Sequence, residues 1–437
     1  MRTMPDLPSG RTAANALLEY IDASPSPWHA VAMAAARLET LGFVRLEEAT
    51  RWSLAPGGRH YVVRGGSSVI AFVVGSGEMA HAGLRLVGAH TDSPGLRLKP
   101  RAATAGDGLA RLGVEVYGGP ILASFADRDL GLAGRVMVRD ADGPQPRLVQ
   151  ISRPLLRLAN LAIHMNREVN ESGLKFNKQT ELPLLLGQLA DKAEPDAELR
   201  RLLAEVAQVE PDAIMGWELC AHDLQPGTLW GANEEFVASR QLDNLASCHA
   251  AISALGAVGA PVATCVAALF DHEEVGSESA AGAGGSFVGD VLARIGIALG
   301  LDDEDRRRAL ARSFFVSADM AHAYHPSFPA AYEPEHKIRV NGGPVIKTNA
   351  NQRYATGAET AARFMACCEA AGVPCQQYAH RSDLGCGSTI GPIVAARLGI
   401  PTVDVGSPMW AMHSARESAG ADDPAYMIAA LAAVYAG

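Results

Sequence analysis

The chain has 437 residues, of which 48% are hydrophobic and 20% are charged, and its formal net charge is −10 at pH 7. This apolar content excludes an intrinsically disordered chain, and an acidic balance without a cluster of lysines and arginines argues against a nucleic-acid or anionic-membrane surface. The length exceeds the roughly 250–300 residues at which a single core stops growing, so two domains are expected.

The seven cysteines show no CxxC pair, and the chain is far too long for a disulfide-stapled miniature fold, which indicates reduced thiols. The segment Met1–Gly10 lacks the apolar stretch of a signal peptide. No apolar run reaches the roughly 18–20 residues that a membrane-spanning helix needs. We therefore expect a soluble, cytoplasmic protein.

The first part of the chain, residues 1–95, predicts an α/β layer arrangement, because segments with helical apolar spacing precede short apolar strands. A Ser-Pro-Ser-Pro turn separates the two predicted helices. The helices are expected over residues 11–23 and 28–42, and the strands over 60–64, 69–75 and 84–90.

The sequence changes character at about residue 96, where short alternating runs are bounded by Gly, Asp and Pro, as is typical of antiparallel strands. Asp140–Gly143 predicts a hairpin turn, and residues 195–209 predict one amphipathic helix. From residue 236 to 437, Ala-rich helices again alternate with apolar strands. We interpret the chain as one α/β domain, 1–95 and 236–437, interrupted by a β-rich insertion, 96–235.

Four apolar, strand-like runs end in histidines or acidic residues. In open α/β sheets, ligands gather beyond the carboxyl ends of the strands, so these side chains are expected to converge. Imidazole nitrogen and carboxylate oxygen are ligands that suit zinc and similar divalent metals. The residues are His90 and Asp92 after 84–89, Asp271 to Glu274 after 262–270, Asp319 and His322 after 314–318, and His413 shortly after 401–407.

Each of these residues also has an ordinary interpretation as a surface turn, a buried histidine or a solvated acidic loop. Asp243 opens a predicted helix over 244–255, where it is either a further ligand or a simple helix cap. Glu273 and Glu274, leaving a strand, should point to different sides, so that one binds metal while the other takes a proton from the activated water. In His90-x-Asp92, the second imidazole nitrogen would donate to Asp92. The recurrence at strand ends favours a metal site.

Two competing motifs are weaker. The Gly-rich run at 280–286 lacks a following Lys-Ser/Thr and is not a phosphate-binding loop. Cys386, with His380 and Asp383 nearby, could mimic a cysteine nucleophile, but that interpretation leaves the strand-end carboxylates unexplained.

A series of short motifs runs along nearly the whole chain. They are His90-Thr-Asp-Ser-Pro94, Asp127-Arg-Asp-Leu130, Arg153-Pro-Leu-Leu156, Leu161-Ala-Ile-His164, Asn177-Lys-Gln-Thr-Glu-Leu-Pro183, Leu242-Asp-Asn244, Asp271-His-Glu-Glu-Val-Gly-Ser277, Ser317-Ala-Asp-Met-Ala-His322 and Met412-His-Ser414. Together they resemble those of the aspartyl aminopeptidase family, zinc aminopeptidases that also include vacuolar aminopeptidase I. The family often has Trp before the Asp-Arg-Asp-Leu stretch, where this chain has Ser124 and Phe125, a packing change outside the site.

The resemblance implies an α/β/α sandwich catalytic domain of the zinc-peptidase kind, interrupted by a β-rich domain for dimerisation and assembly into a tetrahedral dodecamer. It implies two zinc ions per subunit, with cobalt or manganese as possible substitutes. Asp243 would bridge the ions, Glu273 would be the general base and Asp92 the partner of His90. The implied metal ligands are His90, Asp243, Glu274, Asp319 and His413; the implied substrate-binding residues are His164, from a neighbouring subunit, and His322, Lys347 and Tyr354.

We therefore expect a metallo-aminopeptidase that removes N-terminal residues, preferably Asp or Glu, from peptides. Lys347 could pair with an acidic side chain as a point charge, although most lysines are solvated. The family also contains members that prefer neutral apolar residues. A small-molecule amidase or deacetylase could use the same metal chemistry. An inactive assembly protein would need no metal chemistry at all, and the complete ligand set argues against it.

Overall fold

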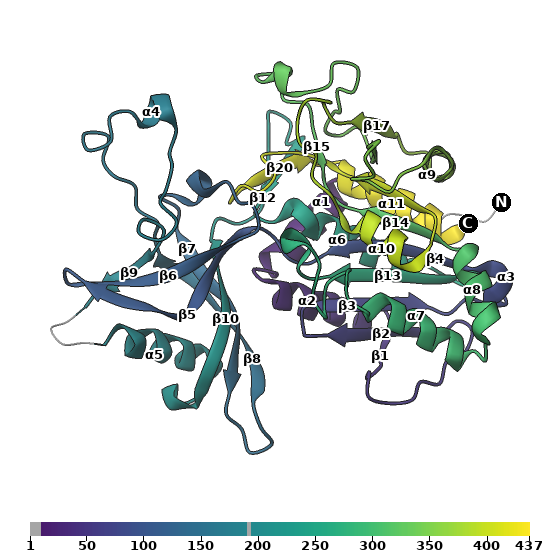
Figure 1. The fold of residues 1–437 in the computed structure, drawn as a ribbon, viewed down its shortest axis with the longest axis horizontal. Helices are drawn as coiled ribbons and strands as arrows, with labels where there is room; N and C mark the ends of the chain where they lie inside the picture. The colour runs from purple at the N-terminus through teal and green to yellow at the C-terminus, as the bar shows by residue number, and fades with distance from the viewer. Residues whose placement is uncertain (1–9, 190–193) are drawn as a thin grey trace.

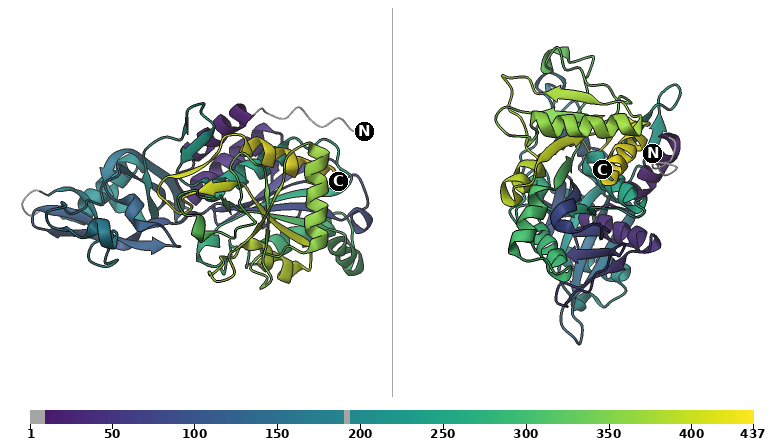
Figure 2. Two further views of the ribbon diagram at one scale, coloured as in Figure 1. Left: turned by 90° about the horizontal axis from the view of Figure 1, so that it is seen from above. Right: turned by 90° about the vertical axis from the view of Figure 1, so that its right-hand side faces the viewer.

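The computed structural model describes residues 10–189 and 194–437, which form an α/β region and a β-rich region side by side (Figure 1). Seen from above, the β-rich region projects from one end of the α/β region (Figure 2). Within the described residues, no helix is both long and apolar enough to cross a membrane.

A nine-stranded sheet forms the centre of the α/β region, in the order β1-β2-β3-β13-β4-β14-β18-β16-β17. The strands β13, β4, β14 and β18 are parallel and buried on both faces, which their continuous apolar runs require. Their carboxyl ends therefore meet at one edge, where Phe270 pairs with His90. The bounds are β1 Val44–Arg45, β2 Arg59–Arg64, β3 Ser68–Val73, β4 Leu84–His90, β13 Thr264–Phe270, β14 Phe314–Ala318, β16 Val345–Thr348, β17 Gln376–Ala379 and β18 Thr402–Gly406.

Helices cover both faces of this sheet and give two apolar cores, so the predicted α/β/α sandwich is confirmed. One face carries α1 Gly10–Asp22, α2 Pro27–Thr40, α6 Leu242–Gly256, α9 Ala358–Ala371 and α11 Asp423–Ala436. The other carries α3 Met79–Ala82, α7 Phe287–Ala298, α8 Asp303–Ala311 and α10 Ile390–Leu398. Local signals set several ends: Pro27 opens α2 behind the cap Ser26, and Gly399 in the left-handed region ends α10.

The β-rich region is an antiparallel sheet in the order β8-β7-β10-β5-β6-β9, packed on α5. The predicted hairpin is confirmed: the Gly143 N–H donates to the Asp140 carbonyl at 3.2 Å, and this turn joins β7 to β8. The bounds are β5 Gly95–Gly106, β6 Leu109–Tyr117, β7 Leu130–Val138, β8 Gln145–Leu156, α4 Val169–Ser172, β9 Leu184–Gln188, α5 Pro195–Ala207 and β10 Ile214–Asp223. We keep residues 1–95, 96–235 and 236–437 as proposed domain limits.

A small five-stranded sheet, in the order β11-β12-β20-β19-β15, was not predicted. It lies beside the carboxyl edge of the large sheet and brings together segments that are far apart in the sequence (Figure 1). Its strands are β11 Thr228–Trp230, β12 Phe236–Ser239, β15 Ala321–His322, β19 Pro408–Trp410 and β20 Glu417–Gly420.

Candidate metal centre

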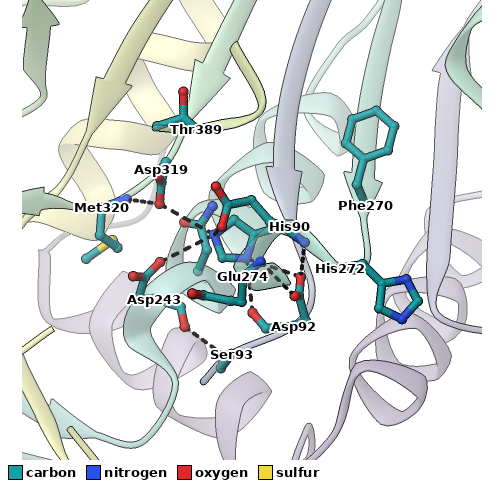
Figure 3. Close-up of polar contacts among 12 residues, drawn as sticks. His90, Asp92, Ser93, Asp243, Phe270, His272, Glu274, Asp319, Met320 and Thr389 are labelled. Carbon is teal, nitrogen blue, oxygen red and sulfur yellow. Dashed lines mark hydrogen bonds and ion pairs between the residues drawn. The ribbon is translucent and has the colours of Figure 1, made fainter. Parts of the chain in front are cut away.

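The five predicted metal ligands meet at the carboxyl edge of the large sheet. Figure 3 shows four of them, His90, Asp243, Glu274 and Asp319. They fall into two groups of three that share Asp243, and within each group the ligand atoms lie within 4.8 Å of one another. One group is His90, Asp243 and Asp319; the other is Asp243, Glu274 and His413. His90 ends β4, Asp319 follows β14, Glu274 follows β13, and His413 follows β19.

His90 presents one ring nitrogen to the carboxylates of the first group. Its Nε2 lies 3.5 Å from Asp243 Oδ1 and 3.5 Å from Asp319 Oδ1. Its Nδ1 lies 3.0 Å from the Asp92 carbonyl oxygen. A carbonyl only accepts, so Nδ1 carries a hydrogen, and Nε2 is the ring nitrogen that faces the carboxylates. A hydrogen on Nδ1 and this support by a carbonyl are typical of metal-bound histidine.

His413 repeats the arrangement in the second group. Its Nε2 lies 3.5 Å from Asp243 Oδ2 and 3.6 Å from Glu274 Oε2, and its Nδ1 lies 3.0 Å from the Gly119 carbonyl oxygen. The two oxygens of Asp243 therefore face different groups. Asp243 lies at the start of α6, but its two oxygens face the two histidines, which favours the ligand interpretation over a helix cap.

The chemistry of this donor set fits zinc. Asp243 Oδ1 is buried and has no hydrogen-bond partner among the described residues, as expected of an oxygen that binds a cation. Burial raises the pKa of Glu274 well above its usual value, and the nearby Asp243 carboxylate raises it further. Burial alone would lower the pKa of His413, but Asp243 and Glu274 raise it to about 10. This concentration of buried negative charge calls for cations, and two imidazoles with three carboxylates are ligands that zinc accepts.

Glu273 lies beside the first group, with Oε2 4.0 Å from His90 Nε2. Burial raises the pKa of Glu273 to about 8, and although His90 opposes this rise, Asp319 and Asp92 add to it. Glu273 and Glu274 occupy a short 3-10 turn, Glu273–Val275, and both carboxylates lie near His90. The two glutamates therefore do not alternate as residues of a strand, contrary to the prediction, because β13 ends at Phe270 and a turn sets both side-chain directions. His272 points away from the cluster (Figure 3).

Asp92 is fully buried and holds that turn. Its Oδ1 accepts from the Glu273 N–H and its Oδ2 from the Glu274 N–H, each at 3.1 Å. The predicted pairing with His90 is made chiefly by the Asp92 main-chain oxygen, since Oδ1 is 3.5 Å from His90 Nδ1.

Three predicted substrate residues lie on the Asp319 side of the centre. Lys347 is 2% exposed, with Nζ 3.1 Å from the Met320 carbonyl and 3.4 Å from Asp319 Oδ2, so it is not a solvated surface lysine. Its Nζ lies 5.1 Å from the centroid of the Tyr354 ring, which is also buried. The His322 ring lies 6.3 Å from that of His380.

His164 is not brought to this centre within one chain. It is exposed in the connection between β8 and α4 of the β-rich region. Among the described residues, no hydrogen bond or ion pair of the centre involves it.

Sequence reasoning missed Glu417, which is 2% exposed. Its Oε1 accepts from the His413 N–H at 2.7 Å, and its Oε2 from the Asp243 N–H at 3.0 Å. An acid four residues after His413 was visible in the sequence, but its burial was not. Tyr117 was missed too: its hydroxyl donates to Asp92 Oδ2 at 2.7 Å.

Comparison with known proteins gives concordant results. Residues 20–435 match the family model described as "Aminopeptidase I zinc metalloprotease (M18)". A probable M18 family aminopeptidase 2 of Stutzerimonas stutzeri (strain A1501) is 47% identical over 423 residues, which cover 96% of this chain and 97% of the relative. The cryo-EM structure of the Ape4 and Nbr1 complex superposes with a TM-score of 0.94 at 38% identity, covering 98% of this chain and 86% of the other. The mApe1 dodecamer of S. cerevesiae gives a TM-score of 0.84 at 26% identity, covering 96% and 95%.

Proposed function

Because this chain belongs to the M18 family of aminopeptidase I zinc metalloproteases, we propose that it removes N-terminal residues from peptides, preferably Asp or Glu, using two zinc ions and Glu273 as general base. The chain is a zinc-dependent aminopeptidase. Its membership of this family favours peptide hydrolysis over the two alternatives, a small-molecule amidase and an inactive assembly protein. The observation that carries the proposal is the pair of donor groups joined at Asp243.

We assign one zinc ion to each donor group. His90, Asp243 and Asp319 would hold the first, and Asp243, Glu274 and His413 the second. Bound zinc supplies Lewis-acid polarisation of the scissile carbonyl and lowers the pKa of water to near neutrality. Cobalt or manganese suits the same imidazole and carboxylate donors.

Glu273 moves the proton in this proposal. Its carboxylate takes a proton from the attacking water and returns it to the leaving amine. Burial, the main cause, raises the pKa of Glu273, so this carboxylate is a stronger base than a solvated glutamate. Asp92 accepts a hydrogen bond from the Glu273 N–H and so fixes the turn that orients the Glu273 carboxylate.

The preference for acidic N-terminal residues rests on Lys347. It is a buried cation beside Asp319, close to His322 and Tyr354, where an acidic substrate side chain would gain an attractive charge. A preference for neutral apolar residues is the alternative outcome of the substrate test.

We propose that the protein forms a homo-oligomer, a tetrahedral dodecamer in which His164 enters the site of a neighbouring subunit. The yeast mApe1 that it resembles is a dodecamer. His164 is exposed and is flanked by Leu161 and Met165, whose side chains are 69% and 76% exposed. Exposed apolar side chains on a protruding loop are typical of a contact between subunits. The cytoplasm stays the proposed location, supported by seven cysteines without a disulfide, all in the described part of the chain.

Hydrolysis of chromogenic aminoacyl substrates tests the proposal. The panel is Asp, Glu, Leu, Ala and Lys, each with added zinc, cobalt or manganese and with a chelator control. We expect chelator-sensitive cleavage that favours Asp and Glu. Chelator-sensitive cleavage that favours Leu would overturn the acidic preference alone, and cleavage that resists the chelator would overturn the metal mechanism.

A further inference from the structure

We propose that the segment 117–124 of the β-rich region is part of the catalytic centre and that Tyr117 is a positioning residue for the reaction. This segment leaves the end of β6 and contacts three separate parts of the centre: Asp92, Glu274 and the loop of His413. The inference rests on the proposed role of Glu273, and it assigns to the β-rich region a task beyond assembly.

Tyr117 acts on the glutamate turn through Asp92. The Tyr117 hydroxyl donates to Asp92 Oδ2 at 2.7 Å, and both groups are buried, Asp92 at 0% and Tyr117 at 9% exposure. The same carboxylate accepts the backbone N–H groups of Glu273 and Glu274. A carboxylate oxygen has two favourable acceptor directions, and Oδ2 uses them for the hydroxyl and the Glu274 N–H. Tyr117 therefore fixes the rotation of Asp92, and Asp92 fixes the turn.

Arg97 holds the Tyr117 ring in place. Its guanidinium carbon lies 3.4 Å from the centroid of the Tyr117 ring and 5.8 Å from that of Trp28, which belongs to α2 of the α/β region. Arg135 of β7 lies over Trp28 from the β-rich side, 5.0 Å from the ring centroid. Cations over aromatic faces are attractive contacts, and more so when desolvated. A row of alternating cations and aromatic rings therefore crosses the boundary between the two regions, from Arg135 of β7 through Trp28 and Arg97 to Tyr117.

Gly118 continues the contact on Glu274. Its φ is +65°, and a Cβ at this position would lie 3.1 Å from the Glu274 Cβ and 3.3 Å from the Glu274 carbonyl oxygen. The backbone of the segment therefore packs against this ligand at a distance that leaves little room for a side chain.

The next residues hold the loop of His413. The Gly119 carbonyl accepts from His413 Nδ1 at 3.0 Å, and the Ile121 N–H donates to the His413 carbonyl at 2.8 Å. Ser124 Oγ accepts from the Ala415 N–H at 2.8 Å. The Gly119 carbonyl of the β-rich region thus fixes the ring orientation that turns His413 Nε2 toward Asp243 and Glu274.

Tyr117→Phe is the decisive variant, because it removes one hydroxyl and keeps the ring under Arg97. We expect kcat to fall about 10- to 100-fold, as for other residues that support metal-site groups, with KM within about twofold of the parent value and zinc content unchanged. The matched control is Tyr61→Phe, a buried tyrosine of β2 whose hydroxyl bonds Glu39 instead. It loses a part-buried hydroxyl that bonds the exposed Glu39, does not touch the centre and should keep its kcat.

If Tyr117 had only a structural role, Tyr117→Phe and Tyr61→Phe would both lower the melting temperature and neither would change kcat. Parental kcat in folded, zinc-loaded Tyr117→Phe would therefore overturn the inference. A second variant, Gly118→Ala, should weaken zinc binding in competition with a chelator, because its Cβ meets Glu274; parental zinc affinity there would contradict the contact. If Glu273→Gln keeps its activity, the proposed base fails instead, so the two failures are distinguishable.

Discussion

The α/β region and the β-rich region contribute to the centre in different ways. The first supplies charged side chains at the ends of parallel strands, which converge because β13, β4, β14 and β18 share one edge. The second supplies a phenol and main-chain groups from one strand end, which hold Asp92 and His413. The α/β region thus supplies the metal-ligand side chains, and the β-rich region helps to orient them. We expect variants that remove these contributions one at a time to lose activity, zinc binding or stability to different extents.

The largest loss is expected for Asp243→Ala, since Asp243 belongs to both donor groups. We expect activity at the detection limit and less bound zinc per subunit than in His413→Ala, which removes a ligand from one group. Metal analysis after dialysis, alongside the rate assay, measures both. Equal zinc content in the two variants would contradict the shared position of Asp243.

Next comes Glu273→Gln, which removes the general base and keeps the ligands. Activity should fall by about 10²- to 10⁴-fold, the usual contribution of a positioned base, while zinc stays bound. The control is Glu278→Gln, an exposed glutamate five residues along the chain that should keep its activity. If Glu273→Gln hydrolyses the substrate at the parental rate, Glu273 is not the general base.

Glu417→Gln sharpens the comparison, because Glu417 orients ligands from within the α/β region. It accepts the N–H groups of Asp243 and His413, and a neutral amide has only one oxygen to offer them. We expect zinc affinity, measured against a chelator, to fall about 10- to 100-fold. Glu235→Gln, a half-buried glutamate outside the centre that also accepts a backbone N–H, should leave the affinity unchanged. If Glu417→Gln keeps the parental zinc affinity, Glu417 does not orient the ligands, and the β-rich segment alone does so.

The smallest effect concerns stability in acid. Burial lowers the pKa of His249 in α6 to about 3, and in the part of the chain that the structure describes neither ring nitrogen has a hydrogen-bond partner. Below the unfolded-state pKa near 6.5 only the unfolded chain binds this proton, so the stability falls as the pH drops toward 3. At pH 5 this histidine lowers the free energy of unfolding by about 2 kcal/mol relative to neutral pH. His249→Phe should show a smaller drop in melting temperature between pH 7.5 and pH 5 than the parent, and an equal drop would contradict the burial argument.

The parts of the site that could be predicted share one physical cause. Apolar runs fully buried in a parallel sheet are recognisable in the sequence, so β4, β13, β14 and β18, and the acidic residues and histidines after them, could be located before the structure was known. Asp243 needed the family resemblance, since alone it could equally have capped a helix.

Tyr117 and Glu417 could not be predicted, because their roles depend on packing between distant segments. Tyr117 meets Asp92 across 25 positions of sequence, and Glu417 meets Asp243 across 174. Nothing in the local sequence indicates that a tyrosine at a strand end or a glutamate in a short strand is buried. The small sheet was missed for the same reason: its strands are too short to show a period.

The pairing of β4 with β13 also constrains how the chain folds as it leaves the ribosome. His90 is in register with Phe270, so the centre of the large sheet cannot close until the whole β-rich region has been synthesised. The strands of that region are consecutive, β5 to β10, and its first and last strands are neighbours, with Leu96 opposite Ala221. Local pairings form faster than distant ones. The region inserted in the middle of the sequence is therefore expected to fold first, leaving the earlier strands of the large sheet exposed until β13 arrives.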